Sequence, residues 1–170
     1  FNVWNHTTAS WGGRSAPWTG WGSDNPRNNY FLSFVTATVL WGAAAGQENA
    51  TAASWLTVGR AKVERDLADT HTADTPGGGS LEGTGYGTAL KNLWFLHVLW
   101  EASTGERWSD LSSSTAGSIG YLLGAIIPTG DLFAPIGDQS RVTEASVTDY
   151  QREALLALAG ELASAPLVLH

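Results

Sequence analysis

The sequence of 170 residues contains no cysteine and no methionine. The absence of cysteine excludes disulfides, thiolate catalysis and cysteine-ligated zinc. No apolar run of about 18 residues or more occurs, so we expect no transmembrane helix, and no signal peptide is recognisable. Because the chain begins with phenylalanine and lacks methionine, we expect it to be a mature or excised piece of a longer protein.

Basic residues are scarce, with 9 Lys and Arg against 16 Asp and Glu, for a net charge of −7. This balance argues against a nucleic-acid partner, which needs a basic face. A polyanionic substrate would need a local positive field, for which the sequence offers Arg14, Arg27, Arg60 and Lys91. The four histidines show no ligand spacing, and no phosphate loop or dinucleotide fingerprint is present. We therefore expect neither a metal nor a cofactor.

Tryptophan, in contrast, is abundant, with nine residues in the chain. Four of them lie among Gly, Ser, Thr, Asn and Pro near the amino end, namely Trp4, Trp11, Trp18 and Trp21. Such rings either form a recognition surface or cover a small core under a long loop. Both interpretations stay open, and residues 1–28 are predicted to form an ordered loop region.

The rest of the chain, residues 29–170, predicts a helical array, and the whole chain a single domain. Two predicted helices are apolar on nearly every face and must be buried on most sides. The segment between them is amphipathic, with Leu56, Val63 and Leu67 on one stripe. The expected helices cover 29–45, 50–69, 88–103, 109–124 and 147–163. Since the two types alternate, we expect an all-α fold of two-layer helical hairpins.

Two irregular stretches interrupt the helices, "TADTPGGGSLEGTGYG" and "IPTGDLFAPIGDQSRVTEA". Long loops in a compact helical domain are usually functional, and we expect these two on one rim. In the first stretch, Tyr86 stands among glycines where a helix should begin. A phenol near a helix N-terminus can exist as phenolate for part of a cycle, so it could abstract one proton and donate another. The alternative is a tyrosine that covers the core with its hydroxyl in water.

Further candidates lie before the first buried helix. His6 could act as a base near neutral pH, and Asn28 or Asn29 could stabilise an enolate-like charge. The simpler interpretation makes the asparagines helix caps and His6 a surface residue. His97 lies in an apolar helix and is predicted to be a satisfied core histidine.

Carboxylates in the loops support a competing chemistry. Glu82 with Asp24 or Asp138 could flank a sugar, as glycoside hydrolysis requires. Asp131 and Asp138 also fit as turn residues. Nothing in the sequence fixes the separation of these carboxylates, so this alternative stays open.

Three segments resemble bacterial polysaccharide lyases with an α/α-toroid, of the alginate, heparin and hyaluronate lyase type. They are "GWGSDNPRNNYFLSFVTATVLWGAA", "GGGSLEGTGYGTAL" and "FAPIGDQSR", in this order. The resemblance implies cleavage of a uronate-containing polysaccharide by β-elimination. It assigns the acid or acid/base role to Tyr86, charge neutralisation to Asn29 or Asn28, and the base to His6. It further implies substrate contacts by Glu82 and by Trp11, Arg14, Trp18 and Trp21.

The helices are too few for a complete toroid, so we expect an incomplete one. An apolar flank should then be exposed, and it should meet the missing remainder of the chain or a second copy. The resemblance implies a carbon–oxygen lyase, secreted or periplasmic, with a polysaccharide as its partner. A glycoside hydrolase and a non-catalytic glycan-binding module remain alternatives.

Overall fold

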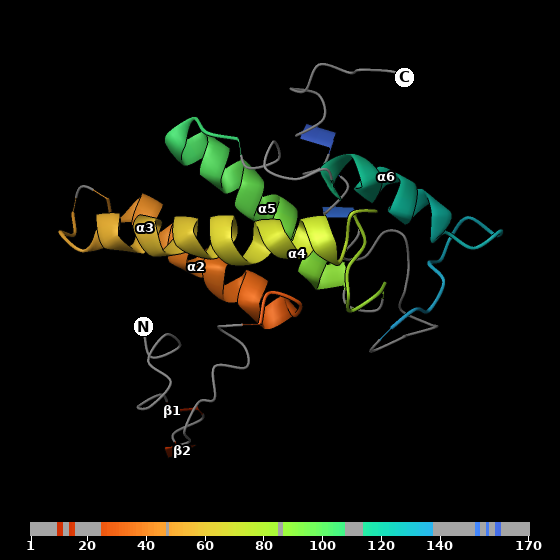
Figure 1. The fold of residues 1–170 in the computed structure, drawn as a ribbon, viewed down its shortest axis with the longest axis horizontal. Helices are drawn as coiled ribbons and strands as arrows, with labels where there is room; N and C mark the ends of the chain where they lie inside the picture. The colour runs from red at the N-terminus through yellow and green to blue at the C-terminus, as the bar shows by residue number, and fades with distance from the viewer. Residues whose placement is uncertain are drawn as a thin grey trace.

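The computed structural model describes Ser10–Trp11, Arg14–Ser15, residues 25–46, 48–84, 87–107 and 114–137, and residues 152, 153, 156, 159 and 160. Of these residues, 64% are helical, which confirms the all-α prediction (Figure 1). The exception is one short antiparallel ladder, β1 (Ser10–Trp11) with β2 (Arg14–Ser15), which pairs Trp11 with Arg14. The sequence did not predict this strand pair, because two residues are too few for an alternating pattern.

Helix α2 (Asn29–Ala44) agrees with the predicted first buried helix. Phe31, Val35 and Val39 recur every four residues and are fully buried, so one face forms the core. The other face is open, with Leu40 46% and Trp41 50% exposed. The prediction that this helix is buried on most sides is therefore wrong for its second half.

The amphipathic segment forms one continuous run of helix: α3 (Ala52–Lys62), a π-helical turn η1 (Val63–Leu67) and α4 (Ala68–Ala73). It extends four residues beyond the predicted end at residue 69. Val63 and Leu67 are buried and Leu56 packs against the core, as the stripe predicts. Gly59 lets α3 approach α2, because a Cβ there would lie 2.4 Å from a methyl carbon of Val39.

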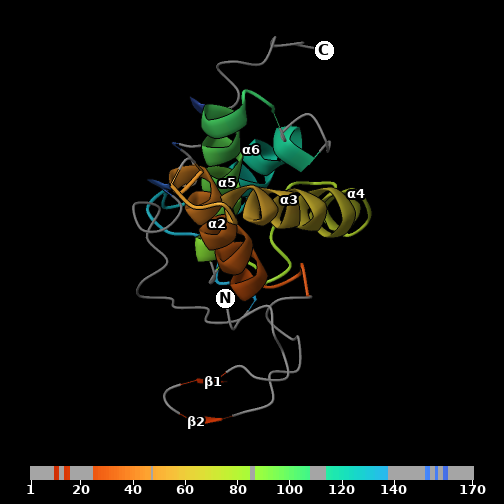
Figure 2. The same ribbon diagram turned by 90° about the vertical axis from the view of Figure 1, so that its left-hand side faces the viewer.

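Helix α5 (Gly87–Thr104) also packs against α2 (Figures 1 and 2). Trp94, Leu96 and Trp100 are buried in the core, whereas Phe95 is 46% exposed. Gly105, with φ of 76°, ends the helix and donates its N–H to Glu101 O. This is the glycine C-terminus that the sequence predicts.

Helix α6 (Ser114–Gly124) follows, and the first five residues of its predicted span lie outside the described residues. A bridge between Ile126 and Phe133 then turns the chain back and buries Phe133. The helical residues between 152 and 160 fall inside the predicted last helix. One of them, Glu153, forms an ion pair with Lys91 of α5, with 3.0 Å between Glu153 Oε2 and Lys91 Nζ.

Candidate functional site

Asn28 forms the N-cap of α2. It has extended backbone angles, and its Oδ1 accepts a 3.0 Å hydrogen bond from the Phe31 N–H. The side chain is buried, with the residue 7% exposed. A cap of this kind satisfies one of the helix's unpaired donors. The cap interpretation of Asn28 is thus confirmed.

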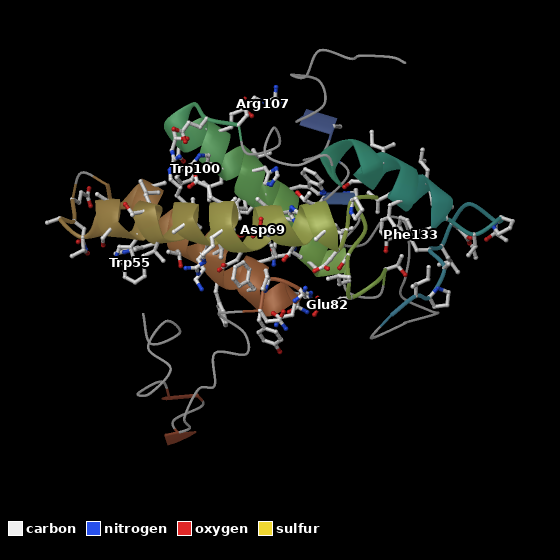
Figure 3. All side chains as sticks on the ribbon, viewed as in Figure 1. Trp55, Asp69, Glu82, Trp100, Arg107 and Phe133 are labelled. Atoms are coloured by element: carbon white, nitrogen blue, oxygen red, sulfur yellow. The ribbon has the colours of Figure 1, made fainter. Side chains whose placement is uncertain are left out.

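Asn29, the first residue of α2, meets the glycine-rich stretch directly. Its backbone N–H donates to Glu82 Oε2 at 2.9 Å, across 53 positions of sequence. Figure 3 shows Glu82 beside the end of α2 at which this helix begins. The first turn of α2 has no acidic residue of its own, so Glu82 supplies the anion that a helix N-terminus favours. Two of the predicted candidate segments therefore share one location.

The two long loops meet beside this contact. Thr84 donates its N–H to Ile136 O at 2.9 Å, and Ile136 returns an N–H bond to Thr84 Oγ1 at 3.1 Å. Gly83 has a φ of 73°, and a Cβ there would lie 2.1 Å from Ile136 O. Only glycine fits this backbone-to-backbone approach. We call these contacts, with the Asn29–Glu82 bond, the loop junction.

The glycines before Gly83 lie in contact with α6. A Cβ on Gly79 would lie 2.9 Å from the Tyr121 ring, and Ser118 Oγ donates to Gly78 O at 2.9 Å. The glycines from 77 to 83 thus hold a segment tightly between α6 and the second loop. The chain continues from this anchored segment to Tyr86, which directly precedes α5.

The remaining candidates are only partly visible. Tyr86, His6, Trp18 and Trp21 lie outside the described residues. The hairpin places Trp11 and Arg14 opposite one another in backbone register, and their side chains are not described. For the hydrolase alternative, Asp24 and Asp138 also lie outside. Asp131 is an exposed turn residue that accepts a hydrogen bond from Thr129, in agreement with the turn interpretation.

His97 is a core residue, with 5% exposed, but it is not satisfied as predicted. Its Nδ1 has no hydrogen-bond partner in the part of the chain that the structure describes. Burial, with a smaller repulsion from His71, lowers the pKa of His97 to about 3. The ring stacks edge-on against Trp94, with centroids 5.0 Å apart. The spacing of apolar residues in a helix predicts that His97 is buried. Whether its ring nitrogens find hydrogen-bond partners depends on neighbouring elements, whose positions this spacing does not predict.

His71 is the residue that sequence reasoning overlooked. It lies on α4 and lines a pocket together with Asn28 and the glycine-rich segment. Burial lowers its pKa to about 4, so the imidazole is neutral at neutral pH. Its position two residues beyond the predicted helix end gave no signal, because the amphipathic stripe stops at Leu67.

Comparison with known proteins identifies no relative. No family model, no curated protein and no solved structure matches the chain. The described ranges hold no group of three or more side chains suited to a metal ion. None of the helices in those ranges combines the length and the hydropathy needed to span a bilayer.

Proposed function

We propose that this protein is a polysaccharide lyase that cleaves a uronate-containing glycan by β-elimination. The observation that carries the proposal is the Glu82–Asn29 hydrogen bond, which joins two of the three segments that resemble such lyases. The third segment contributes Ile136 to the same junction. Segments far apart in sequence that converge through main-chain contacts are a reasonable basis for a site on rigid elements.

In the proposed reaction, a base removes the proton at carbon 5 of the uronate. The electrons of that C–H bond form a carbon–carbon double bond, and the bond to the glycosidic oxygen at carbon 4 breaks. Tyr86 protonates the departing oxygen, and His6 or Tyr86 takes the first proton. Asn29 neutralises the carboxylate of the uronate, so that the negative charge that develops on this sugar when it loses its proton is stabilised. Trp11, Trp18 and Trp21 stack on sugar rings, and Arg14 contacts a carboxylate.

The wider setting is part of the same proposal. The helical hairpins form part of an α/α-toroid, and the protein acts outside the cytoplasm, where polysaccharides are found. Leu40, Trp41 and Phe95 are exposed on α2 and α5, which suits an apolar flank that meets further chain or a second copy.

The test is the near-ultraviolet absorbance of unsaturated uronate products on alginate, hyaluronan, chondroitin and heparin. The wild-type protein should generate this signal on at least one polymer, and Tyr86→Phe should abolish it. Tyr121→Phe is the matched control, because it keeps the ring that packs against Gly79 and should retain activity.

Two other outcomes would contradict the proposal. New reducing ends without absorbance, lost in Glu82→Gln and kept in Tyr86→Phe, would identify a glycoside hydrolase. In that outcome Glu82 would be the ionised base or nucleophile, because its carboxylate accepts a helix N-terminal N–H that stabilises the anion. Binding of a glycan without turnover, unaffected by Tyr86→Phe, would identify a binding module.

A further inference from the structure

Two hydrogen bonds in series connect the second turn of α5 with the first residue of α2. Asn92 Nδ2 donates to Ser33 Oγ at 2.8 Å, and Ser33 Oγ donates to Asn29 O at 2.9 Å. A hydroxyl has a single proton, which Ser33 gives to Asn29, so its oxygen can only accept from Asn92. The side chain of Asn92 therefore joins α5 to the residue at which α2 begins.

Both backbone groups of Asn29 are thus bonded to side chains. Its N–H donates to Glu82 Oε2 at 2.9 Å, and its carbonyl accepts from Ser33. Within the described ranges, no hydrogen bond uses the Asn29 carboxamide. The protein fixes the backbone of Asn29 from two elements and does not commit its side chain to the fold.

The same contacts attach α2 to the chain on both sides of Tyr86. Glu82 precedes Tyr86 and bonds to the first residue of α2, whereas Asn92 follows it and bonds to the second turn. In the proposed reaction, Tyr86 and Asn29 act on the same sugar. Catalytic groups must be held to within about 0.5 Å, and a displacement of about 1 Å can cost on the order of a hundredfold in rate. The spacing between the starts of α2 and α5 is therefore critical for this reaction.

We propose that Asn92 is a positioning residue for the elimination, which acts through Ser33 to fix Asn29 relative to the start of α5. This inference rests on the proposed function, because it takes Asn29 as the group that neutralises the carboxylate of the uronate. Asn92 itself contacts no substrate. Without its donor, Ser33 is no longer tied to α5, and Asn29 keeps the Glu82 bond but loses its link to the helix that follows Tyr86.

The first measurement is steady-state kinetics on the polymer that the wild-type protein cleaves. Asn92→Ala should lower kcat about tenfold or more with a much smaller change in KM, because neutralisation matters most as charge develops. Ser33→Ala should do the same. The double variant should lose no more than either single variant, since both substitutions break the same connection.

Thr36→Val is the matched control. Thr36 Oγ1 donates to Asn92 O at 3.3 Å, so this variant also removes a hydrogen bond between α2 and α5, but it leaves every contact of Asn29 in place. It should lower the stability to chemical denaturation about as much as Ser33→Ala does, and it should leave kcat unchanged. A loss of kcat in Thr36→Val as large as that in Asn92→Ala would overturn the inference, because any weakened helix contact would then suffice.

The second measurement does not need activity. Amide hydrogen exchange of the Asn29 N–H, followed by NMR, should become about fivefold faster in Asn92→Ala and Ser33→Ala than in Thr36→Val, as expected for the loss of one local hydrogen bond. Ser33→Ala removes a single oxygen atom and decides the matter if Asn92→Ala does not fold. Equal exchange in all three variants of an active protein would overturn the inference and leave the proposed function intact. An inactive wild-type protein would instead contradict the proposed function itself.

Discussion

The loop junction and the opposite end of the helical body are held together in different ways. At the loop junction, backbone meets backbone, and Glu82 reaches a main-chain N–H on α2. At the other end, which we call the charged end, Arg60 lies 5.2 Å over the Trp100 ring and pairs with Glu64 and Glu106. Figure 3 shows Glu82 beside the start of α2 and Trp100 on α5, well away from Glu82.

The difference is in what each contact tolerates. Long side chains at the charged end are half exposed and can rearrange, so water replaces a lost partner at little cost. The loop junction has no such freedom, because a Cβ on Gly83 or Gly137 would enter the facing backbone. A site that needs fixed geometry is better served by the loop junction, whereas the charged end closes the helix pair without positioning anything else.

The largest effect should come from Gly83→Ala. The new Cβ would lie 2.1 Å from Ile136 O at a φ of 73°, so both contact and backbone are strained. We expect a loss of about 4 kcal/mol in the free energy of unfolding, measured by chemical denaturation. Gly130→Ala separates the two causes, since its φ is 79° with no atom within 4 Å of the new Cβ. Gly130→Ala should lower the free energy of unfolding by only about 1 kcal/mol. If Gly83→Ala and Gly130→Ala lowered it equally, the two loops would not be in tight contact at Gly83.

The second effect concerns His97, between the two ends. Its pKa is lowered to about 3 by burial, while the unfolded chain keeps the ordinary value of 6.5. Below pH 6.5 the unfolded state therefore binds a proton that the folded state does not, and stability falls as the pH falls towards 3. His71, lowered to about 4, acts in the same direction.

Between pH 7 and pH 5, His97 alone should remove about 2 kcal/mol from the free energy of unfolding. Denaturation curves at each pH measure this slope. His97→Phe should flatten it by the His97 share, and His71→Gln by a share of its own. An unchanged slope in His97→Phe would mean that the imidazole is already paired in the folded protein.

The third effect tests the anion at the loop junction. Glu82→Gln keeps an oxygen for the Asn29 N–H but loses the charge that the helix N-terminus favours. We expect a loss of about 0.5–1 kcal/mol, smaller at high salt, from denaturation at two ionic strengths. Glu106→Gln removes a charge at the charged end and serves as the comparison. If Glu106→Gln cost more, the division between a fixed and a tolerant end would be wrong.

The sequence predicted the helices better than it predicted their environment. Asn28 as a cap, the stripe through Val63 and Leu67, and Gly105 as a terminator follow from local spacing, and all three are confirmed. The Glu82–Asn29 bond joins residues 53 positions apart, which no local pattern encodes. For the glycine-rich stretch, the sequence predicted only an irregular loop with Tyr86 among glycines. The structure adds that Gly79 lies against the Tyr121 ring of α6 and that Gly83 lies against Ile136 of the second loop.

The smallest effect should come from the charged end itself. Arg60→Gln removes the ion pairs to Glu64 and Glu106. The Arg60 side chain in these pairs is 40% exposed. Exposed pairs contribute little, so we expect a loss below about 0.5 kcal/mol from the charges, which salt should reduce further. The contact with Trp100 adds a second component that salt does not screen as strongly. Arg60→Lys keeps the charge but loses the planar stacking group, so comparing the two variants separates pairing from stacking. A loss from Arg60→Gln as large as that from Gly83→Ala would show that the charged end is as rigid as the loop junction.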